Sequence, residues 1–130
     1  MLNMKHISIL LAFLMTLSSP VAAQDFLKGF DALHAGDYAT ALKEWTPLAE
    51  AGGGHSQHNV GRVYYKRAGV PQDYKEAIKW FTLAAEQGVA GAQFDLGIMY
   101  RNGQGVPQDY KEAVKWYTLA AEQGYAVEWY

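Results

Sequence analysis

A stretch of sixteen residues occurs twice in this 130-residue chain, with two differences between the copies. DYKEAIKWFTLAAEQG spans residues 73–88, and DYKEAVKWYTLAAEQG spans residues 109–124, an offset of 36 residues. The same offset, without a gap, aligns GRVYYKRAGVPQDY from Gly61 with GIMYRNGQGVPQDY from Gly97. Self-similarity at a fixed period of this length is typical of proteins built from stacked units. The sequence therefore predicts a repeat architecture.

The second half of each unit has the pattern of an amphipathic helix. Asp73 and Glu76 have the spacing of a capping box, in which each side chain bonds the backbone of the other, and Pro71 stands just before them. Gly88 is a typical residue after the end of a helix. The apolar residues between these signals recur three or four positions apart, which predicts one buried stripe: Ala77, Trp80, Phe81, Ala84 and Ala85.

The first half of each unit predicts another helix, so that each unit would consist of an A helix followed by a B helix. In the last unit the A helix is expected at residues 90–101, with Leu96 and Tyr100 facing inward. Gly97 and its counterpart Gly61 are the expected points of close helix contact. Because one helix pair cannot bury both of its apolar faces, near-identical units are expected to stack.

A weaker copy, GDYATALKEWTPLAEAG from Gly36, extends the pattern toward the N-terminus. Its A helix is expected at residues 25–35. The chain then divides into a signal peptide, an N-terminal helix pair, two repeats and an incomplete helix start, at residues 1–23, 24–53, 54–89, 90–124 and 125–130.

Residues 1–23 have the pattern of a secretory signal peptide. Lys5 gives a basic start, residues 7–17 are almost wholly apolar, and small residues precede the expected cleavage after Ala23. An apolar run of this length is shorter than the roughly 20 residues that a membrane-spanning helix needs. We expect a mature chain that begins at Gln24 and works in the periplasm or outside the cell.

Residues 90–124 also resemble a known repeat. Leu96-Gly97, Tyr100, Asp109 and Trp116-Tyr117 stand in the register of a Sel1-like repeat, a relative of the tetratricopeptide repeat. The resemblance extends over residues 36–124 and implies an all-α fold. That fold is a right-handed α-solenoid of antiparallel helix pairs, with a concave groove lined by the A helices. The preceding repeat lacks one loop glycine, and the first pair is more similar to an ordinary tetratricopeptide hairpin.

The resemblance also implies which residues face the groove. The two repeats differ at these positions although their core positions agree, as expected for a shared scaffold with a specialised surface. An ordinary solvated face would also vary in this way. We expect Arg62, Tyr65, Phe94 and Arg101 to contact a partner while contributing little to folding. The groove positions are His55, His58, Arg62, Tyr65 and Lys66 in one repeat, and Gly91, Phe94, Ile98, Arg101 and Asn102 in the next.

The composition argues against several classes of function. The formal net charge of -2, without a run of Lys or Arg, gives no general attraction for nucleic acid. The absence of Cys removes disulfides, thiolate nucleophiles and thiolate metal sites. His55 and His58 could share a helix face and bind a metal, but no third ligand stands at suitable local spacing. We expect no catalytic residues, metal or cofactor.

Taken together, these patterns favour an exported interaction scaffold that binds a protein or peptide partner, in envelope signalling, assembly or host interaction. No stable membrane insertion is expected after signal cleavage. The alternative is a cell-envelope enzyme or accessory factor that acts on peptidoglycan or β-lactam-like substrates, a role linked chiefly with cysteine-rich Sel1-like proteins. The aromatic end of the chain, Tyr125, Trp129 and Tyr130, is expected to cover the last helix only in part. The exposed remainder would allow weak self-association.

Overall fold

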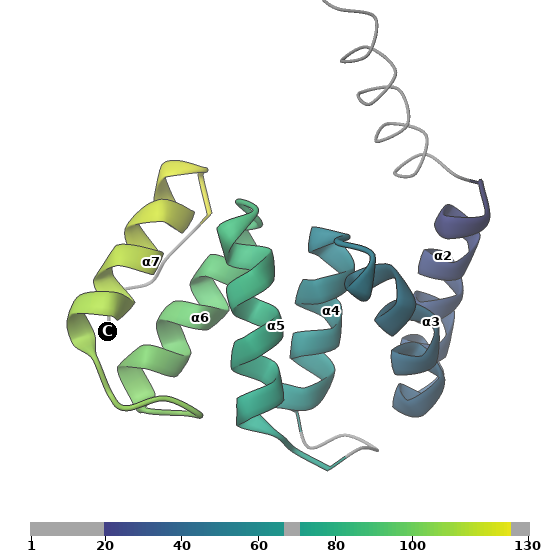
Figure 1. The fold of residues 1–130 in the computed structure, drawn as a ribbon, viewed down its shortest axis with the longest axis horizontal. Coiled ribbons are helices and arrows are strands. Elements are labelled where there is room, and N and C mark those ends of the chain that lie inside the picture. Colours follow the sequence, from purple (N-terminus) through teal and green to yellow (C-terminus); the bar gives the residue numbers. More distant parts are fainter. Residues whose placement is uncertain (1–19, 67–70, 126–130) are drawn as a thin grey trace, which may run out of the picture.

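The computed structural model describes residues 20–66 and 71–125, and every regular element in these two ranges is an α-helix. Consecutive helices contact one another along the whole series, and Figure 1 shows them side by side in sequence order. The structure is therefore the all-α solenoid of helix pairs that the repeat predicts. The A helices are α2 (Pro20–His34), α4 (Gly54–Tyr65) and α6 (Ala90–Asn102), and the B helices are α3 (Tyr38–Glu50), α5 (Tyr74–Glu86) and α7 (Tyr110–Glu122).

Helix α2 begins earlier than the sequence pattern indicated. It starts at Pro20 instead of near Asp25, so it includes four residues assigned to the signal peptide. None of the described helices is long and apolar enough to cross a membrane.

The expected capping box of α5 forms only in part. The Asp73 side chain accepts a hydrogen bond from the Glu76 backbone N–H at 3.0 Å. The backbone N–H of Asp73 instead donates to the carbonyl of Tyr64 at 2.9 Å, while the Glu76 carboxylate accepts from the indole of Trp80 at 3.2 Å. The reciprocal bond is absent because a bond to the preceding A helix already satisfies the Asp73 N–H.

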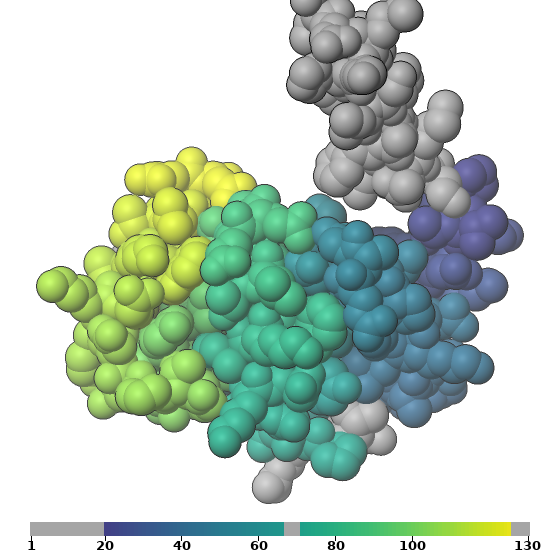
Figure 2. All heavy atoms as spheres, viewed as in Figure 1, coloured from purple at the N-terminus to yellow at the C-terminus, as the bar shows by residue number. Residues whose placement is uncertain are grey.

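The apolar stripe of α5 is buried as predicted. Its five residues, Ala77, Trp80, Phe81, Ala84 and Ala85, expose at most 6% of their surface. One core cluster gathers around Trp45 and Trp80, another gathers around Phe81 and Trp116, and Tyr64 packs against both. Because the two clusters meet in this way, the helix pairs form one continuous body, as Figure 2 shows.

The two expected glycine contacts are present. A Cβ atom at Gly61 would lie 2.6 Å from the Phe81 ring, and one at Gly97 would lie 2.7 Å from the Tyr117 ring. In each repeat the absence of a side chain therefore lets the aromatic ring of the B helix lie directly against the A helix. This contact sets how closely the A and B helices of one repeat approach each other.

Buried glutamines join consecutive units, a feature that the sequence pattern did not reveal. Gln57 donates to the carbonyl of Ala49 in the preceding B helix at 3.1 Å, and its own side-chain oxygen accepts from Gln87 at 2.8 Å. The next unit repeats both bonds through Gln93, which binds the Ala85 carbonyl at 3.2 Å and accepts from Gln123 at 2.9 Å. The buried amide groups are thus satisfied by bonds that hold the stack in register.

Candidate partner-binding groove

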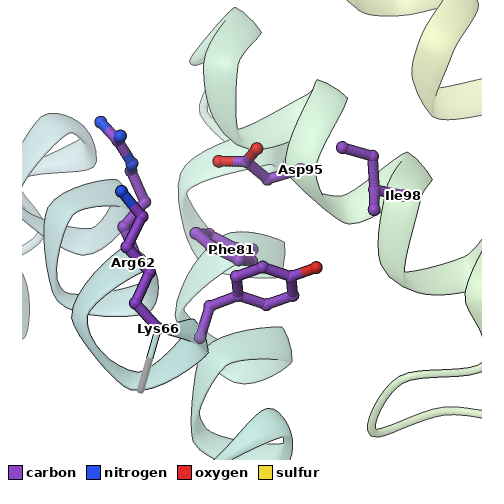
Figure 3. A pocket seen from close by; sticks show the side chains of 6 residues that line it. Arg62, Lys66, Phe81, Asp95 and Ile98 are labelled. Carbon is purple, nitrogen blue, oxygen red and sulfur yellow. The ribbon is translucent and has the colours of Figure 1, made fainter. Parts of the chain in front are cut away.

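A hollow of about 130 Å³, called here the central hollow, lies between α4 and α6. Figure 3 shows Arg62 and Lys66 on one side of it, Asp95 and Ile98 on the other, and Phe81 between them. Its lining residues come from α4 and the residue that follows it, from the B helix α5 and from α6: Arg62, Tyr65, Lys66, Phe81, Asp95 and Ile98. Four of these six were predicted groove residues.

A second hollow of about 140 Å³, called the N-terminal hollow, lies on the opposite side of α4. Arg62 and Lys66 belong to it as well, so this pair forms a basic ridge between the two hollows. The first helix pair supplies most of the apolar lining. The complete lining is Phe30, Leu33, Tyr38, Trp45, Asn59, Arg62, Val63 and Lys66.

The two cations of the basic ridge differ from Lys79 and Lys115 of the B helices. Lys79 lies 3.9 Å from Glu76, and Lys115 lies 3.7 Å from Glu112. Each of these lysines also lies over the ring of the tryptophan that follows it. Within residues 20–66 and 71–125, Arg62 and Lys66 form no ion pair, and both are exposed. The basic ridge is thus available to an anionic group from outside.

The acidic residue of the central hollow is already engaged. Asp95 Oδ2 lies 2.7 Å from His58 Nε2, and both side chains are partly buried. His58 and Asp95 come from consecutive A helices, so this bond ties together the two walls of the groove. Gly91 stands against the same imidazole, since a Cβ atom there would lie 2.7 Å from its Cε1.

Tyr65 and Phe94 are packed more tightly than the sequence analysis expected. The Tyr65 hydroxyl donates to Gln104 at 3.2 Å, and its ring lies 5.5 Å from the ring of Tyr74. The Phe94 ring lies 5.7 Å from the ring of Tyr117. These contacts argue against the expectation that the two aromatic residues contribute little to folding, because both rings pack against the B helices.

The remaining predicted groove residues occupy different surroundings. Ile98 is half-buried and lines the central hollow. Arg101 is half-buried and donates to the exposed Asn102 at 3.4 Å, whereas His55 is exposed at the start of α4. Arg101, Asn102 and His55 line neither hollow.

Burial also affects a phenol of the second repeat. It raises the pKa of Tyr117 above the usual tyrosine value; Arg101 opposes this shift, and Asp95 and Tyr65 add to it. Among the described residues, no group of three or more His, Cys, Asp or Glu side chains could hold a metal ion.

Sequence reasoning missed Asp95, Phe81 and the apolar part of the N-terminal hollow. Asp95 stands 37 residues after His58, so a search for ligands at local spacing could not find it. The repeat was the signal that could have identified Asp95, because Asp95 is equivalent to Asn59 of the preceding repeat, which lines the other hollow. Equivalent positions of consecutive A helices thus line consecutive hollows.

Comparisons with known proteins agree with this architecture. The sequence model of the Sel1 repeat matches residues 54–89 and 90–125. A protective antigen of uropathogenic Escherichia coli strains that displays an SLR fold is similar in structure, with a TM-score of 0.75 and 36% identity over 79% of this chain. A Sel1 repeat protein from Oxalobacter formigenes has a TM-score of 0.71 and 38% identity over 75% of this chain. The alignments span 23% and 40% of those two chains. No curated protein matches the sequence.

Proposed function

The chain belongs to the Sel1 repeat family, whose members are generally non-catalytic scaffolds for protein interactions, and from this we propose that it binds a segment of a partner protein in its groove. The binding surface comprises the central hollow, the basic ridge and the N-terminal hollow.

One observation carries this proposal: two hollows lie on either side of α4 and share Arg62 and Lys66. Each hollow combines aromatic or aliphatic side chains with exposed polar groups, the combination that gives a binding site both affinity and orientation. Solenoid proteins typically bind their partners along an extended surface formed by successive repeats, and two hollows that follow one another along the A helices fit such a mode of binding.

Site-specific photocrosslinking tests the groove directly. A photoreactive amino acid at Asn59, which lines the N-terminal hollow, is expected to form an adduct with a partner protein in living cells. The matched position is Lys75, which is exposed on α5 and lines neither hollow. Equal adducts at both positions, or an adduct at Lys75 alone, would contradict the proposed groove.

We also propose that the protein is exported and acts in envelope signalling, assembly or host interaction. The signal-peptide pattern of residues 1–23 supports export, and the likeness to a protective antigen supports contact with a host. Intact-mass measurement of the protein from periplasm or medium is expected to show the loss of these residues, with Gln24 at the N-terminus. Recovery at full-length mass from the cytosol alone would overturn this part of the proposal.

A further inference from the structure

We infer that the groove recognises an acidic peptide segment in which a carboxylate lies between two apolar side chains; this inference rests on the proposed function of the groove. The carboxylate would bind the basic ridge, and each apolar side chain would enter one hollow.

The charge of the basic ridge selects the carboxylate. Arg62 and Lys66 are exposed at the boundary of both hollows and have no ion-pair partner in the described parts of the chain. Asp95 lines the same hollow, but within the described residues it pairs with His58 at 2.7 Å and forms no ion pair with Arg62 or Lys66. A guanidinium group can bind a carboxylate through two parallel hydrogen bonds. A basic segment would instead be repelled by both cations.

The linings of the two hollows select the apolar side chains. Half-buried Ile98 contributes apolar surface to the central hollow above the buried ring of Phe81. Half-buried Phe30 and Leu33 contribute it to the N-terminal hollow above the buried ring of Trp45. The volumes are about 130 and 140 Å³. An apolar cavity of about 150 Å³ in another protein accommodates a benzene molecule. Each hollow therefore has room for one side chain of moderate size, such as Leu or Phe.

Three labelled synthetic peptides provide the test, measured by fluorescence anisotropy with the full chain. The first contains Leu-Gly-Glu-Gly-Phe, the second has Gln in place of Glu, and the third has Ala in place of both Leu and Phe. The acidic apolar peptide is expected to bind at least about tenfold more tightly than either of the others, and its binding is expected to weaken as ionic strength rises.

Paired variants with the same change of charge locate the binding site. The double substitution Arg62→Gln and Lys66→Gln is expected to abolish the preference for the acidic peptide. The double substitution Lys79→Gln and Lys115→Gln removes two cations from the B helices and is expected to change affinity less than about twofold. Thermal melting checks that both variants remain folded.

Specific results of the peptide and vesicle experiments would contradict this inference. Equal binding of the Glu and Gln peptides, or no binding of any peptide, would overturn this inference. The proposed function of the groove would then still be tested separately by the photocrosslinking contrast between Asn59 and Lys75. Phosphatidylglycerol vesicles provide a further arm. If they bind through Arg62 and Lys66 while the acidic peptide does not compete, the basic ridge contacts a membrane surface and the inference is wrong.

Discussion

The Nε2 atom of His58 lies 2.7 Å from the Oδ2 atom of Asp95, and this contact joins the A helices of consecutive repeats. The two side chains are only 16% and 26% exposed, so the bond is partly shielded from water. Asp95 also lines the central hollow. A bond that stabilises the stack therefore also fixes one wall of the groove.

A double-mutant cycle with His58→Ala and Asp95→Ala is expected to show a coupling free energy of about 1 kcal/mol in urea denaturation. The reason is that either substitution alone leaves a partly buried polar group without its partner. The exposed pair Glu112 and Lys115, at 3.7 Å, is the control and is expected to give less than about 0.5 kcal/mol. Strictly additive effects of His58→Ala and Asp95→Ala would show that the bond contributes nothing to stability.

Substitution of Gly61 by Ala distinguishes helix propensity from packing. Propensity alone predicts a gain of about 1 kcal/mol in the free energy of unfolding. The added Cβ would lie 2.6 Å from the Phe81 ring, and such overpacking costs about 1–3 kcal/mol. We therefore expect Gly61→Ala to lower the free energy of unfolding measured by urea denaturation. In a protein that also carries Phe81→Leu, which provides space, the same substitution is expected to cause no such loss. A gain in the otherwise unchanged protein would mean that the ring moves aside freely.

The sequence was sufficient to predict features that depend on periodicity. The stripe from Ala77 to Ala85 was predictable because helix spacing alone places its residues on one face. The bond from the Asp73 N–H to Tyr64 was not predictable, because a local capping signal cannot show that another helix supplies an acceptor. The same reason applies to His58 and Asp95, whose contact depends on how two repeats are packed.

Three alanine substitutions separate the exposed groove surface from residues that pack in the fold. Arg62→Ala is expected to change the free energy of unfolding by less than about 0.5 kcal/mol, because the side chain is exposed and forms no ion pair within residues 20–66 and 71–125. Phe94→Ala is expected to cost about 1 kcal/mol or more, since its ring packs on Tyr117. Tyr100→Ala is expected to cost about 3 kcal/mol as a large-to-small change beside the core. Chemical denaturation tests this order. A larger loss for Arg62→Ala than for Tyr100→Ala would mean that the groove face and the core face have been assigned the wrong way round.

Stability is expected to fall at alkaline pH. Burial raises the pKa of Tyr64, Tyr100 and Tyr117, and nearby carboxylates add to each shift, although Arg101 opposes it at Tyr117. The folded state therefore retains phenolic protons that the unfolded chain loses. This contribution is fully present below pH about 10 and is lost as the pH rises through the folded pKa values.

The matched substitutions Tyr117→Phe and Tyr110→Phe test this explanation. Tyr117 is buried, whereas Tyr110 is 64% exposed. Urea denaturation at pH about 8 and about 10.5 is expected to show a smaller alkaline loss for Tyr117→Phe than for the unchanged protein. Tyr110→Phe is expected to leave that loss unaltered. Equal effects of the two substitutions would show that burial of Tyr117 is not the cause.

The outer face of α7 is expected to support weak self-association. Val114 is 50% exposed, whereas Ile78, at the equivalent position of α5, packs against the core beside α6. The predicted covering residues Trp129 and Tyr130 lie outside the described part of the chain, and their deletion is expected to strengthen association. Val114→Glu is expected to weaken it, because a charge on this face would have to be desolvated. Leu83→Glu, at an exposed position of α5, is the control. Sedimentation velocity over a wide concentration range measures the effect, and a strict monomer before and after the deletion would show that this face does not associate.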